Sequence, residues 1–367
     1  MFTRTDDKIT TTQASIFISS SVLGAGILTL PRSVVSAAKT SDVWLSILIS
    51  GVIVILMAIV MAKLSQKFSE KTIFQYASNI VGAPLAFIVS TLLLIYFIMI
   101  AGFELRVLAE VTMFYLLEGT PIWAIIIPFV WLSGYLLFGG INAIARLLQI
   151  IFPISILVLI ITYLLSLKIF DIDQLRPFLG EGLLPVINGL KSTVLVFSGF
   201  EVTMFLIAHM QHPKQAIKAV VTGLGIPVCI YLFTLIFVVG GLSVDAVLRS
   251  TWPTIDLLRS FEISGLFFER LEFPFMVIWT MQMFSNFTCY YYGASLGISQ
   301  LIKVNISPVI LGLMPFIYLS AMIPKRSNDI FAVGDFIGWS SAVLFVIIPL
   351  PLYLIWLIRS KGLKQHV

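Results

Sequence analysis

Residues 22–28, with the sequence VLGAGIL, interrupt the first long apolar segment of the chain with two glycines. A second interruption, FSGFE at residues 197–201, lies in the sixth apolar segment. Backbone polar groups at membrane depth need partners, so an unwound turn persists there only where it lines a protein cavity or receives a ligand. Breaks at matching positions in two halves of a membrane protein are the best sequence indication of a ligand site near the bilayer midplane.

The composition predicts an all-α polytopic membrane protein. Of the 367 residues, 59% are hydrophobic and 11% are charged, whereas a soluble domain carries about 25% charged residues. The apolar runs are about 20 residues long, which is the length a helix needs to cross roughly 30 Å of hydrocarbon. The net charge of +5 comes largely from lysines and arginines beside these runs, so it indicates orientation and lipid contact rather than nucleic-acid binding.

The order of apolar segments predicts a single transmembrane domain over residues 1–367. We expect ten transmembrane helices, at about residues 10–35, 43–62, 85–117, 122–141, 147–167, 185–210, 219–242, 273–302, 307–323 and 334–358. Breaks in helices 1 and 6 favour a 5+5 inverted-repeat transporter-like fold, with one five-helix repeat at 10–167 and the second at 185–358. The tails 1–12 and 359–367 are expected in the cytoplasm, and the loop 243–272 is expected to hold a short interfacial helix.

The first break offers backbone groups to a ligand. Glycines at 24 and 26 allow positive φ and remove side-chain bulk around Ala25. The half-helix that begins near Ile27 would point its N-terminus, with partial positive charge, at a ligand carboxylate. Gly24, Ala25 and Gly26 are therefore candidate ligand-binding residues. Close packing of helices through small residues is the alternative interpretation.

The second break adds a charge to the backbone opening. The second break consists of Ser198, Gly199, Phe200 and Glu201. Because an ionisable residue within a span is costly, its presence is by default a functional hypothesis. Glu201 would pair with a substrate ammonium, anchor the broken backbone or carry a proton; a structural carboxylate that caps exposed N–H groups is the alternative. We expect the two opened turns to face each other, with unpaired amides and carbonyls available to a small ligand.

The third apolar segment carries three charges in its second half. Arg106 and Glu110 are four residues apart and can pair on one helix face, which favours a structural ion-pair network, whereas Glu104 needs a partner from elsewhere. Tyr96, Ile100 and Glu104 form a stripe with a spacing of four. If this stripe faces the breaks, Tyr96 and Ile100 provide an apolar and aromatic wall of the site; ordinary packing is the alternative.

Polar residues also interrupt the eighth apolar segment. Ser285, Asn286 and Thr288 either hydrogen-bond between helices or line a cavity. We include Ser285 and Asn286 among the candidate ligand-binding residues, and we assign the aromatic run at 290–292 to packing or to the membrane interface.

No residue pattern indicates an enzyme, a metal site or a cofactor. The sequence lacks a nucleophile–base constellation and a phosphate-binding loop. Cys229 and Cys289 lie within apolar segments without metal-ligand spacing, so buried free thiols are expected. His209 and His212 are three residues apart, but no cysteine or carboxylate completes a ligand set, and solvation at the interface explains them better.

Several motifs resemble the B subunits of bacterial spore germinant receptors, in order along nearly the whole chain. They are LGAGILTLPR at 23–32, FELR at 103–106 with Glu110, FDIDQLRP at 170–177, GEGL at 180–183, GFEV at 199–202 and WPTI at 252–255. The Gly-Ala-Gly cluster occurs in many amino-acid transporters, so the motifs around 176 and 252 carry most of the resemblance.

This resemblance implies a ten-span protein of the amino acid–polyamine–organocation superfamily in the inner membrane of a dormant spore. It implies partners as well, a larger membrane-bound A subunit and a lipoprotein C subunit, and a nutrient ligand, either an amino acid or a sugar. The ligand pocket would include residues 24–26, Tyr96, Ile100, residues 198–201 and the polar residues of the eighth span. A working amino-acid transporter driven by protons or sodium is the alternative function.

Overall fold

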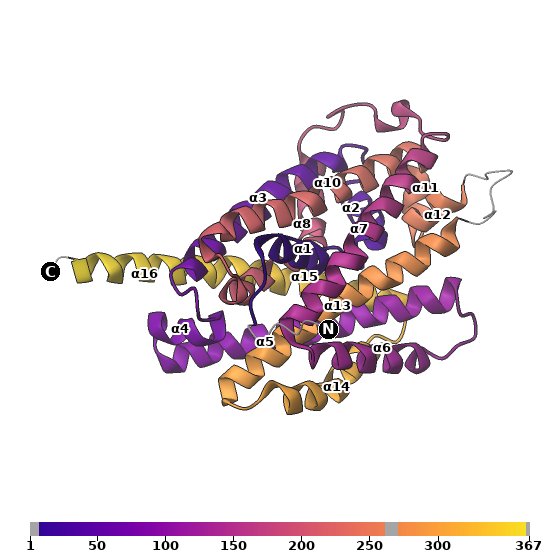
Figure 1. Ribbon diagram of the computed structural model, residues 1–367. Helices are drawn as coiled ribbons and strands as arrows, with labels where there is room; N and C mark the ends of the chain where they lie inside the picture. The colour runs from indigo at the N-terminus through magenta and orange to yellow at the C-terminus, as the bar shows by residue number, and fades with distance from the viewer. Residues whose placement is uncertain (1–6, 261–270, 365–367) are drawn as a thin grey trace.

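The computed structural model describes residues 7–260 and 271–364, and this part of the chain is helical (Figure 1). Apart from one isolated β-bridge between Ile9 and Met210, the described residues contain no strand. The first half consists of α1 (Thr11–Val22), α2 (Gly26–Ala38), α3 (Val43–Gln66), α4 (Ile73–Val81), α5 (Ala83–Tyr115), α6 (Ile122–Leu137) and α7 (Gly140–Ser166). The second half consists of η1 (Ile172–Leu175), α8 (Leu184–Val196), η2 (Phe200–Val202), α9 (Thr203–Leu206), η3 (Ile207–His209), η4 (Pro213–Gln215), α10 (Ala216–Leu242), α11 (Val244–Arg249), α12 (Pro253–Arg259), α13 (Glu272–Ile302), α14 (Ile306–Met322), α15 (Ser327–Ile347) and α16 (Pro349–Lys364).

The lengths and apolar composition of the helices establish a multi-pass membrane protein. Five helical stretches within the described residues are long and apolar enough to cross a membrane: Val43–Gln66, Ala83–Tyr115, Gly140–Ser166, Pro213–Leu242 and Asn328–Ile358. Two bent helix pairs bring this number to seven, and α6 and α14 are apolar but shorter. The helix α13 is 31 residues long, and most of its middle is buried inside the bundle, including polar residues such as Gln282 and Asn286.

Several helix boundaries differ from the sequence-based prediction. Asn142 and Arg146, expected in a loop, lie within α7, because Gly140 at φ +70° lets the chain reverse just after α6 ends. Residues 359–364, expected in a tail, continue α16. The described part of the loop 243–272 contains two short helices, α11 and α12, where one was expected, while residues 1–6, 261–270 and 365–367 of the predicted tails and loop lie outside the described residues.

The two cysteines are free thiols, but only one of them is buried. Cys289 lies in the buried middle of α13, as expected. Cys229 of α10 is exposed, so the expectation that it is buried was wrong. An apolar sequence around a residue predicts the membrane environment, but it does not distinguish a face that packs inside the bundle from one that contacts lipid.

Both predicted breaks are present. The pair α1 and α2 bends by 51° between Val22 and Gly26, and the pair formed by α8 and residues 200–209 also bends by 51°. The helix α1 packs against α7, α10 and α13, while α2 packs against α8 and α10 (Figure 1). The breaks are consequently enclosed by other helices, and Leu23 and Ala25 are 1% and 2% exposed.

Gly199 allows the two breaks to touch. Its φ of +118° lies in a region that side chains rarely adopt, and a Cβ atom there would lie 2.8 Å from the amide nitrogen of Val22. We expect Gly199→Ala to lower the free energy of unfolding by at least about 2 kcal/mol, since it adds backbone strain to this clash. Melting of the purified protein in detergent measures the effect. The matched control is Gly225→Ala in α10, where the new methyl group meets nothing within 4 Å. Equal melting temperatures for the two variants would contradict this packing.

Candidate ligand-binding site at the two helix breaks

Side chains of α13 replace the helix hydrogen bonds that the first break loses at Ser21. The amide nitrogen Nδ2 of Asn286 donates to the Ser21 carbonyl oxygen at 2.7 Å, and the Tyr290 hydroxyl donates to the same oxygen at 3.0 Å. Since Asn286 and Tyr290 are four residues apart, they share one face of α13. That face therefore points at the break.

The next two carbonyl groups are capped in the same way. The Tyr231 hydroxyl of α10 donates to the Val22 carbonyl oxygen at 2.7 Å. The side-chain nitrogen Nε2 of Gln282 donates to the Leu23 carbonyl oxygen at 2.9 Å. The carbonyl groups of the first break are thus held by fixed side-chain donors, and the expectation that they are unpaired was wrong.

A carboxylate from α5 occupies the amide side of the first break. Glu104 Oε2 accepts a hydrogen bond from the Ala25 backbone nitrogen at 3.0 Å, at the start of α2. The Glu104 side chain is 7% exposed. A helix N-terminus favours an anion because its free N–H groups carry partial positive charge. The position predicted for a ligand carboxylate is therefore taken by a carboxylate of the protein itself.

The second break is held by Glu201, which is fully buried. Its Oε2 atom accepts from the Gly199 backbone nitrogen at 2.7 Å, and its Oε1 atom accepts from the Tyr96 hydroxyl at 2.8 Å. The Ser21 hydroxyl donates to the Gly199 carbonyl oxygen at 3.0 Å. This last hydrogen bond joins the two breaks directly, and the hydrogen bond from Tyr96 ties α5 to the second break.

The site is rich in hydrogen-bond acceptors. Within the described residues, the ion pairs in the structure join Arg106 to Glu110, Arg176 to Asp173 and Arg259 to Glu272, so none involves Glu104 or Glu201. The side-chain oxygens of Gln282 and Asn286 are buried without a hydrogen-bond partner there. Because the nitrogens of both amides already donate to carbonyl groups, these oxygens are free acceptors. The arrangement suits a ligand that brings N–H or O–H donors.

The space at the first break is filled in this conformation. A Cβ atom on Gly24 would lie 2.7 Å from Asn286 Nδ2 and from Glu104 Oε2. A Cβ atom on Gly26 would meet the Tyr231 hydroxyl at 2.5 Å. A ligand therefore enters only if Asn286 or Glu104 moves away.

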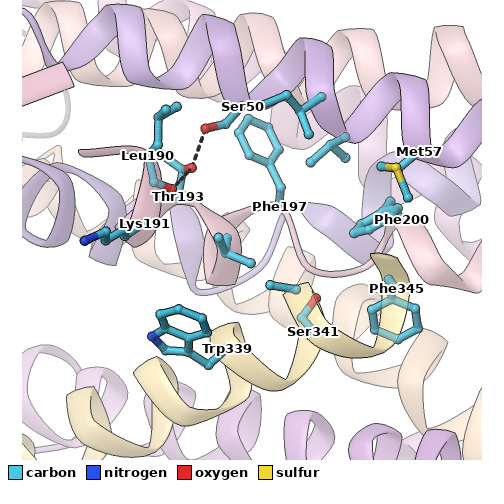
Figure 2. Close-up of a pocket in the computed structure, with 14 residues that line it drawn as sticks. Ser50, Met57, Leu190, Lys191, Thr193, Phe197, Phe200, Trp339, Ser341 and Phe345 are labelled. Carbon is cyan, nitrogen blue, oxygen red and sulfur yellow. Dashed lines mark hydrogen bonds between the residues drawn. The ribbon is translucent and has the colours of Figure 1, made fainter. Parts of the chain in front are cut away.

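The remaining candidate residues are a buried side chain of α5, two serines and an aromatic ring at the second break. Ile100 is buried on the α5 face between Tyr96 and Glu104. Ser198 and Ser285 donate to the carbonyl oxygens four residues earlier, those of Val194 and Met281. Phe200 turns its ring toward an apolar cavity of about 340 Å³ beside the second break (Figure 2).

The charges farther along α5 lie in a separate cluster. Arg106 forms an ion pair with Glu110 at 3.2 Å, the pairing that a spacing of four predicts. Arg106 also donates to the Lys325 carbonyl oxygen at 3.4 Å, before α15. This cluster ties α5 to the connection between α14 and α15.

Three residues of the site were missed by sequence reasoning. Gln282 and Tyr290 lie four residues on either side of Asn286, so the spacing in α13 was a usable signal for both. Tyr290 is buried in the bundle, as the assignment to packing expects, and its hydroxyl also caps Ser21. Tyr231 stands alone in an apolar segment, and nothing in the sequence distinguishes it.

Comparison with known proteins identifies the family. A family model described as spore germination protein matches residues 8–330. The chain is 43% identical to the spore germination protein YndE of Bacillus subtilis, over 99% of this chain and all of YndE. It is 35% identical to the spore germination protein A2 of the same organism, over 96% of each chain. The chain belongs to the spore germination protein family.

The spore germination protein shares its fold with membrane transporters. A solved structure described as MhsT in complex with L-phenylalanine covers 96% of this chain and 99% of its own, with a TM-score of 0.69 and 12% sequence identity. Identity this low supports the fold alone. The family is one of germination proteins with transporter-fold neighbours and not an enzyme family.

The hydrogen bond from Ala25 to Glu104 can be tested by paired substitutions. We expect Glu104→Ala to lower the free energy of unfolding by about 1–3 kcal/mol, because it leaves a buried N–H group without a partner. Glu104→Gln keeps an acceptor oxygen at the same place, so it should lose less than half as much. Melting of both purified variants in detergent provides the measurement, and a Glu104→Ala variant as stable as the parent protein would refute the capping role.

Proposed function

We propose that this germination protein is the nutrient-sensing subunit of a spore germinant receptor, with a binding site for a small nutrient between the two helix breaks. One observation carries the proposal. The breaks meet at Ser21 and Gly199, and carboxylates of the protein hold amide groups of both. The relatives named as spore germination proteins and the neighbour described in complex with L-phenylalanine support an amino acid as the nutrient.

The proposal includes a membrane arrangement. We infer ten spans in a single transmembrane domain, formed by two inverted five-helix repeats over 10–167 and 185–358, in the spore inner membrane. Short tails at 1–12 and at the C-terminal end lie on the cytoplasmic side. A larger membrane-bound A subunit and a lipoprotein C subunit receive the signal. Ten spans are consistent with the described helices, which include five clear spans, two bent pairs, the shorter apolar helices α6 and α14, and the buried helix α13.

An exchange of carboxylates explains how a nutrient would act. The carboxylate of an amino acid replaces Glu104 at the N-terminus of α2, while its ammonium group faces Glu201 and the free oxygens of Gln282 and Asn286. One anion replaces another at the helix terminus, and the ammonium group of the ligand supplies a positive charge that offsets the displaced Glu104 carboxylate. A ligand shifts such an equilibrium only by its differential affinity for the two states. If Glu104 occupies the helix terminus about 99% of the time, the apparent affinity of the nutrient falls about 100-fold.

A proton- or sodium-coupled amino-acid transporter is the second candidate function. Glu104 and Glu201 favour it, because they are buried, they have no ion-pair partner among the described residues, and an intramembrane carboxylate is a common element of proton relays. A sensor and a transporter would share the pocket, so the fold does not distinguish them.

The glycine at the first break provides the test of the site. We expect Gly24→Trp to abolish the germination response to nutrients, since even a Cβ atom at this position contacts Asn286 and Glu104. The control is Gly225→Trp, where a Cβ atom meets open space. Spores carrying each variant are exposed to a panel of amino acids and sugars, and co-purification checks that the partner subunits still assemble. Normal nutrient sensitivity in an assembled Gly24→Trp receptor would exclude the site.

Uptake measurements separate the two functions. The purified chain is reconstituted into liposomes with imposed proton and sodium gradients, and accumulation of a labelled amino acid that triggers germination is followed. A sensor should bind the label without concentrating it inside the liposome. Concentrative uptake above that of liposomes with the Gly24→Trp variant would instead identify a transporter.

A further inference from the structure

The apolar cavity that Phe200 faces lies beside the proposed nutrient site. It occupies about 340 Å³ between α3, α8 and α15, within the usual range of about 300–1,000 Å³ for ligand pockets. Figure 2 shows Lys191 at one end and Met57, Phe200 and Phe345 at the other. Most of the 14 lining side chains are apolar, and their only charge belongs to Lys191. The cavity is thus amphipathic along its length.

The side walls of this cavity reach the lipid-facing surface. Ile53 of α3 is 50% exposed and Trp339 of α15 is 66% exposed. Both helices belong to stretches long and apolar enough to span a membrane. In such helices an exposed apolar side chain contacts acyl chains, so the cavity opens sideways into the bilayer.

The cavity follows the second half of α8 to the second break. Lys191 lies near the middle of α8, and Phe200 lies just beyond the break, where the chain bends by 51°. From Lys191 to Val196, the last residue of α8, the helix rises about 8 Å at about 1.5 Å per residue. A chain that fills the cavity would therefore extend from the region of Lys191 to the second break.

The positive charge of Lys191 indicates which kind of lipid head group would fit at this end of the cavity. Its side chain is exposed, and the described residues contain no ion pair that includes it. Two hydroxyl groups of the lining, those of Ser50 and Thr193, form a hydrogen bond with each other at 2.5 Å. A cation at the end of an apolar channel suits an anionic head group, since a long lysine stem places its charge toward the lipid interface.

We infer that this cavity binds an anionic phospholipid of the surrounding bilayer, with one acyl chain between α3, α8 and α15 and the head group near Lys191. This lipid site is distinct from the nutrient site, and it does not depend on the function proposed for the nutrient site.

The cavity adjoins the residues that hold the second break. Phe197 and Phe200 line it on either side of Gly199. The Phe200 ring lies 5.7 Å from the Phe345 ring, which lies 5.0 Å from the Tyr96 ring. Tyr96 in turn donates to Glu201. A bound acyl chain therefore presses on the same aromatic cluster that positions Glu201, which couples lipid occupancy to the geometry of the break.

Photo-crosslinking tests the lipid site. The full chain is placed in nanodiscs that contain a small fraction of phosphatidylglycerol with a photoreactive group in one acyl chain, and adducts are mapped by mass spectrometry. We expect adducts to concentrate on the α3 and α15 peptides that contain Val54, Met57 and Phe345. Lys191→Glu should reduce them about fivefold, as expected for a cation that attracts an anionic lipid. Ala342→Phe, which fills the cavity, should reduce them to a similar extent.

Matched variants and competitors complete the test. Lys168→Glu reverses the charge of an exposed lysine beyond α7. Gly312→Phe adds a ring at a position where a Cβ atom meets nothing within 4 Å. Both variants should form as many lipid adducts as the parent protein. Unlabelled phosphatidylglycerol should compete, and phosphatidylcholine should not. Adducts spread evenly over the lipid-facing helices, no effect of Lys191→Glu in a folded protein, or competition by free fatty acid alone would each overturn the inference. None of these readouts involves a nutrient, so they leave the proposed sensor function untouched.

Discussion

The hydrogen-bond requirement of an opened backbone in the middle of a membrane governs this structure. The first break removes helix partners from the carbonyl groups of Ser21, Val22 and Leu23 and from the Ala25 amide. Each buried group left unpaired would cost about 1–3 kcal/mol. Side chains from α5, α10 and α13 supply all four partners. These helices are therefore held around the break by the same bonds that make it possible.

This arrangement has a consequence for switching. A break whose partners are side chains, not backbone, can exchange those partners without unfolding a helix. Glu104 and Asn286 lie in direct contact with the position of a Gly24 Cβ atom, so both occupy the space that a ligand would need. In the proposed sensor, the protein therefore competes with its own ligand, and the stability of the empty state would set the nutrient concentration at which the sensor responds. Because Ser21 and Gly199 are joined by a hydrogen bond, a movement of one break displaces the other.

The fold could be predicted from the sequence further than the site could. Both breaks coincide with gaps in the helices, at residues 23–25 and 197–199, because glycine within a long apolar run weakens the helix at that point. The Arg106–Glu110 pair follows from local spacing. The backbone group that each side chain holds could not be predicted, since Glu104 is 79 residues from Ala25 and Asn286 is 265 residues from Ser21. The local sequence shows where backbone groups lose their helix partners, whereas tertiary packing decides which side chains replace them.

We propose that the carboxylate of Glu104 stands where a nutrient carboxylate binds. The most direct measurement is an experimental structure of the assembled receptor with a nutrient that triggers germination. We expect ligand density between residues 24–26 and 199–201, with Glu104 moved away from the Ala25 amide. Ligand density elsewhere, with the bond between Glu104 and Ala25 intact, would contradict this claim.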